Sequence, residues 1–214
     1  MVQQDNHNAN ALICMYNSES KCSGCELNES LKCKFEKKHL RSFILSFLIF
    51  AIPSVFGMIL SGYGWFLLGW IGFMLFFFNV WESRILCRHC PFYSEKEKIL
   101  HCIANYGAYK LWNYDPKPMT SSEKAQLIIG FLILAGYPLF FIFIGNQYLF
   151  LLISIAGLGI FFGILLFRTC SKCVNFSCPL NRVPKTIVNA YLKRNPVMKC
   201  AWEAAGYSME KDEF

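Results

Sequence analysis

The sequence predicts an all-α membrane protein with four transmembrane helices as two hairpins and a cysteine-rich arm, loop and tail on the cytoplasmic side. Of the 214 residues, 55% are hydrophobic and only 16% are charged, which is unusual for a soluble domain. The apolar residues gather in four runs, each close to the ~20 residues that a helix needs to cross a ~30 Å hydrocarbon core. All 11 cysteines lie outside these runs.

The apolar runs contain no Asp, Glu, Lys, Arg or His. Aromatic residues at their ends, such as Trp65, Trp81 and Tyr148, are typical of the boundary between membrane and water. Short turns join the first run to the second and the third to the fourth, so the sequence predicts two tight helical hairpins. The runs are Ser42–Leu60, Trp65–Trp81, Leu127–Gly145 and Tyr148–Phe167.

The charges of the connecting segments predict the topology. Because an even number of spans returns the chain to its starting side, the arm, the loop and the tail share one side. All 21 Lys and Arg lie in these three segments, so the positive-inside rule predicts a multi-pass protein of the cell membrane with both termini in the cytoplasm. The same rule explains the net charge of +7 without a nucleic-acid partner. The segments are the arm 1–41, the first hairpin 42–81, the loop 82–126, the second hairpin 127–167 and the tail 168–214.

Two Cys-x2-Cys pairs follow the second and fourth runs at nearly matching places. Cys87 and Cys90 come six and nine residues after the second run, and Cys170 and Cys173 come three and six residues after the fourth. Two thiolates at this spacing can face one zinc ion or one iron–sulfur cluster. Because neighbouring helices lie ~8–10 Å apart, we expect these four cysteines to share one metal centre.

The remaining cysteines leave an alternative open. Each pair could instead complete its own site, the loop pair with Cys102 and the tail pair with Cys178 and Cys200. The arm has enough thiols for a further zinc ion or cluster, unless its cysteines bind nothing. The arm cysteines form C-x7-C-x2-C-x7-C and are Cys14, Cys22, Cys25 and Cys33.

Local signals predict helices in the loop and tail. Ser94-Glu-Lys-Glu97 has the form of a capping box, and the apolar residues that follow it at helical spacing predict a short amphipathic helix with Cys102 on its apolar face. A second capping box, Thr120-Ser-Ser-Glu123, precedes the third run. In the tail, Ile187, Val188, Tyr191 and Leu192 predict another amphipathic helix, and Asn195-Pro196 begins a last helix that carries Cys200 and ends at Gly206.

The predicted compartment and the cysteine spacing favour metal over disulfides. Cytoplasmic thiols are kept reduced, and three Cys-x2-Cys pairs in one chain are typical of metal sites. We expect an iron–sulfur cluster, with zinc as the alternative. The absence of His and of charged groups from the runs argues against a membrane haem b and against an ion-coupled transporter.

The best interpretation of function is electron transfer between a cytoplasmic redox protein and the membrane. Lipid surrounds the spans, and the candidate redox partner in the membrane is a quinone. The Phe-rich second run, with Asn79 and Glu82 near its end, would suit one. The second interpretation is a zinc-stapled scaffold or assembly subunit without catalysis. Whether the protein is an enzyme stays open.

The order of spans and motifs resembles that of the membrane quinol dehydrogenases of the nitrate-reductase type. Those proteins carry C-x3-C-P where this chain has Cys87-x2-Cys90-Pro91 and Cys170-x2-Cys173, and their ferredoxin repeats are missing here. The topology is also similar to that of DHHC protein acyltransferases, with Arg88-His89-Cys90-Pro91 in place of Asp-His-His-Cys-Pro. The second resemblance implies a third function, acyl transfer.

Overall fold

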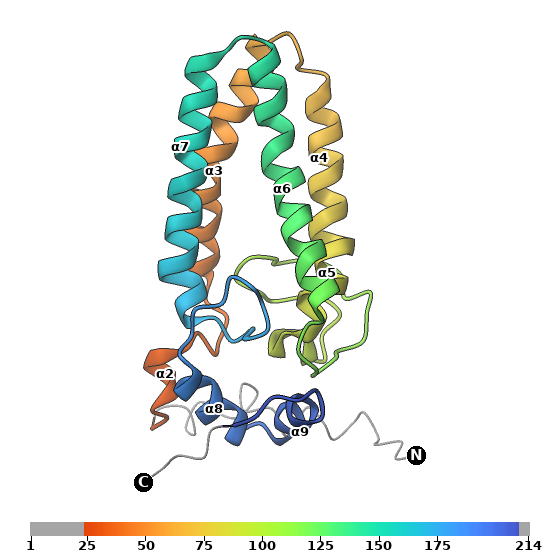
Figure 1. Ribbon diagram of the computed structural model, residues 1–214, viewed down its shortest axis with the longest axis vertical. Coiled ribbons are helices and arrows are strands. Elements are labelled where there is room, and N and C mark those ends of the chain that lie inside the picture. The colour runs from red at the N-terminus through yellow and green to blue at the C-terminus, as the bar shows by residue number, and fades with distance from the viewer. Residues whose placement is uncertain (1–23, 210–214) are drawn as a thin grey trace.

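The computed structural model describes residues 24–209, and its regular elements are helices (Figure 1). Four helices are long and apolar enough to cross a membrane, and they stand side by side along the long axis. The predicted all-helical fold with four potential spans is therefore confirmed. The described parts of the arm, loop and tail all gather at one end of these helices, which we call the cysteine-rich end.

Helical structure extends beyond the predicted apolar runs into the polar residues at the cysteine-rich end. The first span begins at Lys37 and the third at Ser121, while the second and fourth continue through a π-helical turn. Thr120 caps the third span in a capping box with Glu123, as predicted. The helices are α2 (Leu27–Ser30), α3 (Lys37–Leu60), α4 (Phe66–Phe76), the π-helix η3 (Phe77–Trp81), α5 (Glu82–Ile85), the 3₁₀ turns η4 (Cys87–His89) and η5 (Pro91–Ser94), α6 (Ser121–Ile144), α7 (Tyr148–Ile164), the π-helix η6 (Leu165–Thr169), the 3₁₀ turn η7 (Cys170–Lys172), α8 (Lys185–Lys193) and α9 (Pro196–Ala204).

Among the spans, α3 and α7 share the most extensive contact. Helices α3 and α7 lie side by side, as do α4 and α6 (Figure 1). Small residues make the first approach possible, because a Cβ at Gly157 would lie 2.6 Å from the carbonyl oxygen of Ile49. Ser54 and Ser154 are fully buried in the same region. Small side chains bring backbones together where lipid supplies no hydrophobic force between helices.

Large side chains and hydrogen bonds join the other pair, α4 and α6. The indole Nε1 of Trp70 donates to the carbonyl of Leu134 at 2.9 Å, and the hydroxyl of Tyr137 donates to the carbonyl of Phe66 at 3.0 Å. Pro138 has no N–H, so the carbonyl of Leu134 lacks its helical donor and accepts from Trp70 instead, while the carbonyl of Phe66, the first residue of α4, accepts from Tyr137. These two hydrogen bonds fix the register of the two helices.

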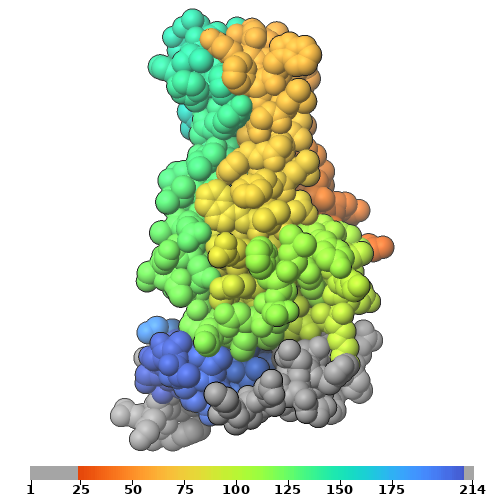
Figure 2. Space-filling model, turned by 90° about the vertical axis from the view of Figure 1, so that its right-hand side faces the viewer, coloured from red at the N-terminus to blue at the C-terminus, as the bar shows by residue number. Residues whose placement is uncertain are grey.

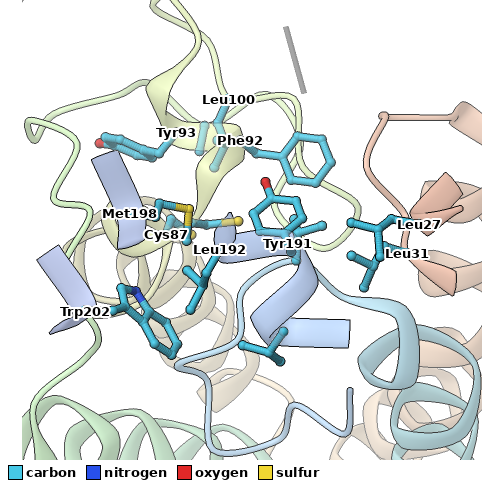
Figure 3. Packing of buried hydrophobic residues seen from close by; sticks show 14 residues of the cluster. Leu27, Leu31, Cys87, Phe92, Tyr93, Leu100, Tyr191, Leu192, Met198 and Trp202 are labelled. Carbon is cyan, nitrogen blue, oxygen red and sulfur yellow. The ribbon is translucent and has the colours of Figure 1, made fainter. Parts of the chain in front are cut away.

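The arm, loop and tail form one cap with a common apolar core at the cysteine-rich end. Leu27 and Leu31 of the arm belong to the same buried cluster as Phe92 of the loop and Tyr191 and Trp202 of the tail (Figure 3). On the face formed by α4 and α6, the loop covers the lower part of α4 and the tail lies beneath (Figure 2). The described part of the arm therefore folds with the cap and is not a separate unit.

The amphipathic helix predicted after Ser94 is wrong. Ser94 is the last residue of η5, and its hydroxyl donates to the carbonyl of Pro91 at 2.7 Å instead of capping a helix. The following residues fold back as a loop closed by an antiparallel bridge between Ile99 and Tyr109. Gly107 has a φ of 89° and turns this loop.

Both predicted helices of the tail are present, as α8 and α9. Val188 and Leu192 on the predicted apolar face of α8 are buried, which confirms the helical pattern. Asn195 precedes the first residue of α9, and Gly206 follows its end with a φ of 91°. The Asn195 side chain makes no capping hydrogen bond to α9, and its amide nitrogen donates to the carbonyl of Tyr191 at 2.8 Å.

Candidate metal centre

The two Cys-x2-Cys motifs adopt the same backbone conformation. Each follows a π-helical segment and forms a 3₁₀ turn, η4 in the loop and η7 in the tail. The second cysteine leaves the turn in an extended conformation, with φ −85° and ψ 136° at Cys90 and φ −82° and ψ 133° at Cys173. The backbone N–H of this second cysteine donates to the carbonyl of the first, with N···O distances of 2.9 Å in the loop and 3.5 Å in the tail. Single π turns often mark functional sites, and here they set the direction in which each pair leaves its span.

Both pairs face one cavity at the boundary between the spans and the cap. The cavity has a volume of about 210 Å³. Six thiols line it, from all the cysteines of the loop and from three of the tail. They belong to Cys87, Cys90, Cys102, Cys170, Cys173 and Cys178.

Two asparagine side chains stabilise this site. One joins its tail half to its loop half, and the other joins the loop to the end of the second span. The amide of Asn175 in the tail donates to the carbonyl of Leu86, the residue before Cys87, at 3.1 Å. Asn105 of the loop donates to the carbonyl of Phe78 and approaches the Cys87 sulfur at 3.7 Å. Both asparagines are buried. Neither stood out in the sequence, because a lone Asn in a loop carries no motif.

Burial raises the pKa of the cavity thiols. Loss of solvation, reinforced by neighbouring sulfurs, raises the pKa of Cys173 to about 12, and the pKa of Cys178 rises to about 12 for the same reasons. The pKa of Cys90 lies well above its ordinary value because of burial and the nearby Cys102, Cys173 and Cys178. The mutual influence of these groups places loop and tail thiols within electrostatic range of one another.

Two charged residues also line the cavity. Glu82, the first residue of α5, is only 4% exposed, and its Oε2 has no hydrogen-bond partner among the described residues. Lys32 reaches the cavity from the arm. Its backbone N–H donates to the carbonyl of Lys172 at 2.8 Å, and its ammonium donates to the carbonyl of Arg168 at 2.9 Å. Burial lowers the pKa of Lys32, and the thiols of Cys170 and Cys173 act against this shift.

The residues inside the loop motif point away from the cavity and anchor it. Arg88 forms an ion pair with Glu123 at 2.8 Å. His89 is buried, with Nδ1 at 2.8 Å from the carbonyl of Lys117 and Nε2 at 3.3 Å from Glu123. Since both ring nitrogens have partners, His89 acts as an anchor of the turn rather than as a ligand.

The other predicted ligands lie elsewhere. Cys200 is exposed on α9 and does not line the cavity. Cys25 accepts a hydrogen bond from the Arg194 guanidinium at 2.7 Å. Cys33 packs at the edge of the cap core. Because Cys14 and Cys22 lie outside the described residues, the separate site of the arm stays a prediction.

A different group of potential ligands forms in the loop. Glu95, Glu97 and His101 have ligand atoms within 4.8 Å of one another. His101 Nδ1 lies 2.9 Å from a Glu95 carboxylate oxygen. His101 adjoins Cys102 in the sequence, but its Nδ1 faces the carboxylates of Glu95 and Glu97.

The donor set is one of soft ligands, and the thiols are spaced around the cavity. Thiolates bind zinc, copper(I) and iron–sulfur clusters in preference to hard cations. Four sulfurs at ~2.3 Å from one zinc ion would lie within ~4 Å of one another, yet among residues 24–209 no three thiols approach within 4.8 Å. The thiols are thus spaced around the cavity and do not converge on one position.

The cavity continues away from the sulfurs, between α3, α6 and α7. Aromatic side chains dominate this apolar half, including Phe47, Phe131 and Phe161. At the opposite ends of the spans the same helices close together, because a Cβ at Gly57 would lie within 3.0 Å of both Ile142 and Phe150. The helices therefore diverge toward the cysteine-rich end and leave the cavity between them.

Comparisons of this chain with protein-family models, with curated proteins and with solved structures found no match.

Proposed function

We propose that the cavity holds an iron–sulfur centre through which the protein passes electrons between a cytoplasmic redox protein and the membrane. One observation carries the proposal: six thiols from the loop and the tail line a single cavity that extends between potential membrane spans. Cys87, Cys90, Cys170 and Cys173 are the principal ligands in this proposal, and Cys102 and Cys178 supply further thiolates.

The spacing of the thiols favours iron–sulfur over zinc. A structural zinc site would need four of these sulfurs to close on one point, whereas the described thiols stand apart around the cavity. An iron–sulfur cluster supplies one-electron chemistry at potentials that its surroundings tune. The chain supplies burial and the positive charge of Lys32 beside the tail pair, both of which act on that potential.

A quinone is the proposed partner on the membrane side. The apolar half of the cavity is rich in Phe and opens between the spans, as suits a lipid-soluble ring. Glu82 lines the same cavity with one oxygen that can accept a hydrogen bond from a quinol hydroxyl or, when the carboxyl is protonated, donate one to a quinone carbonyl. The sequence pointed to Glu82 and to the second span for this role, but most aromatic lining residues come from α3, α6 and α7.

Metal analysis of protein purified without oxygen tests the proposal. We expect iron and acid-labile sulfide together with a broad absorption band in the violet that bleaches on reduction. Cys87→Ser/Cys90→Ser should lose both, while the matched control Cys200→Ser, outside the cavity, should retain them. Stoichiometric zinc with no colour would contradict the iron–sulfur centre.

Zinc is the second candidate. The thiols lie where the arm, loop and tail meet, so a zinc ion bound there would cross-link segments of the cap. A zinc-bound protein would then be a scaffold or assembly subunit without redox chemistry. The structure lends no support to acyl transfer, because both residues that would carry it, His89 and Cys90, are buried and His89 has partners at both nitrogens.

A further inference from the structure

A second groove lies on the outside of the molecule, at the start of α3. Its volume is about 390 Å³. Phe35 of the arm and Tyr106 of the loop form one wall, with their rings stacked and centroids 5.0 Å apart. Lys37 and Arg41, one helical turn apart on α3, line the groove beside them. The junction of the arm with α3 and the distant loop thus meet around two basic side chains.

The positive charge of this groove is uncompensated within the described residues. Lys37 and Arg41 are both exposed, and the structure gives neither an ion-pair partner within residues 24–209. Their neighbour Glu36 is engaged by Lys38 and lies 3.9 Å from His39. The first turn of α3 contains no acidic residue, and Glu36 does not cap it with its side chain.

Lys37 lies in the first turn of α3, where the helix dipole opposes a basic residue and favours an anion. An anion between Lys37 and Arg41 would relieve this effect. The ring centroid of His101 lies 6.2 Å from that of Phe35 on the loop side, and this histidine faces Glu95.

The floor of the groove determines which anion fits. It is made of Leu40, Ile44 and Leu45. Ile44 is 47% and Leu45 57% exposed, and they belong to a potential membrane span. A free phosphate gains nothing from an apolar floor, whereas a phospholipid can place its phosphate on the basic residues and its acyl chain along the helix.

We infer that this groove binds an anionic phospholipid. The phosphate lies between Lys37 and Arg41, and the chain runs past Ile44 and Leu45. A lipid held there contacts the Phe35–Tyr106 wall and so stabilises the junction of arm, loop and first span at the membrane surface. The inference is independent of the metal in the cavity.

Native mass spectrometry of the full chain tests the inference. Delipidated protein is incubated with phosphatidylglycerol or with phosphatidylcholine. The unaltered protein should retain phosphatidylglycerol in preference, and Lys37→Gln/Arg41→Gln should lose that preference. The matched control is Arg182→Gln/Lys185→Gln, which removes the same charge from exposed residues of the tail. Arg182 lies 5.3 Å from the ring of the exposed Phe167, near the end of a potential span.

Other results would overturn the inference. These are no preference in the unaltered protein, unchanged lipid retention in Lys37→Gln/Arg41→Gln, or an equal loss in the control. Displacement of the lipid by inorganic phosphate at equal concentration would assign the groove to free phosphate instead. Ile44→Ser changes no charge and should still weaken lipid retention. Metal content, measured in parallel, should be the same in every variant, so a failed lipid test leaves the cluster proposal standing.

Discussion

The two Cys-x2-Cys turns share a backbone conformation but are held in place by different means. In the loop, buried His89 and the Arg88–Glu123 ion pair fix the turn to the first residues of α6. In the tail, Lys172 donates to the carbonyl of Glu29 at 2.8 Å and accepts from the backbone of Lys32, and these contacts are exposed. The local shape of a turn therefore does not depend on its anchor.

This difference indicates that the loop half of the site is held more rigidly than the tail half. The loop turn is bound to a span through groups that are largely shielded from water, where ionic hydrogen bonds are strong. The tail turn is bound to the arm by solvent-exposed contacts of the kind that contribute little. We therefore interpret the loop half as a rigid platform and the tail half, with the arm, as the part that closes over it.

Replacing either pair should have the largest effect. If the two turns serve one centre, Cys87→Ser/Cys90→Ser and Cys170→Ser/Cys173→Ser should each abolish the same metal equivalent, because all four thiols line one cavity. Metal analysis of both variants checks this. A metal equivalent lost in one variant and kept in the other would assign the pairs to different sites.

Removing the anchor of the loop turn should have the second-largest effect. Glu123→Ala deletes the ion pair to Arg88, the contact to His89 and the side-chain half of the capping box of α6, and we expect the unfolding free energy to fall by ~2–3 kcal/mol. Lys172→Ala, the matched change in the tail, should cost less than ~1 kcal/mol. Thermal unfolding in detergent measures both, and equal losses would refute the rigid platform.

The link between the turns should have an intermediate effect. Asn175→Ala removes the hydrogen bond to Leu86 and should lower stability by ~1 kcal/mol while leaving both turns formed. Metal should then be lost faster to a chelator, because the halves separate more easily. Asn181→Ala is a comparison, since its amide bonds stay within the tail, to Cys173 and Asn175. If Asn175→Ala lost its metal more slowly than Asn181→Ala, this interpretation would be contradicted.

Thiol reactivity should separate cavity from surface. In metal-free protein near neutral pH, Cys173 and Cys178, with pKa raised to about 12 by burial, are almost wholly protonated and should alkylate much more slowly than exposed Cys200. Because a raised pKa leaves less thiolate at a given pH, the rate should climb as pH rises toward 12. Mass spectrometry after timed alkylation reports each site, and equal rates would count against burial.

The smallest signal is expected from topology mapping. If both turns face the cytoplasm, Cys200 should not react with a membrane-impermeant thiol reagent in intact cells and should react after lysis, because it is exposed in the protein. Labelling before lysis would place the tail outside the cell and would also remove the argument from reduced thiols.

The sequence alone determined the features that depend on near neighbours. Apolar runs located the four potential spans, and Cys-x2-Cys spacing was enough to predict paired thiols, because a turn is set by a few consecutive residues. The capping box at Thr120 was correct for the same reason. At Ser94 a similar signal failed, since η5 and the folded-back loop held that segment in another conformation.

Only the tertiary structure decided which residues meet. The approach of α3 to α7 depends on Gly157 fitting a distant backbone, and the closure of the site depends on Asn175 reaching Leu86, 89 residues away. These contacts bring Cys102, Cys178, Glu82 and Lys32 to one cavity and leave Cys200 outside. Such pairings follow from the shape of packed helices and from hydrogen bonds between distant segments. Neither can be inferred from the spacing of residues along the chain.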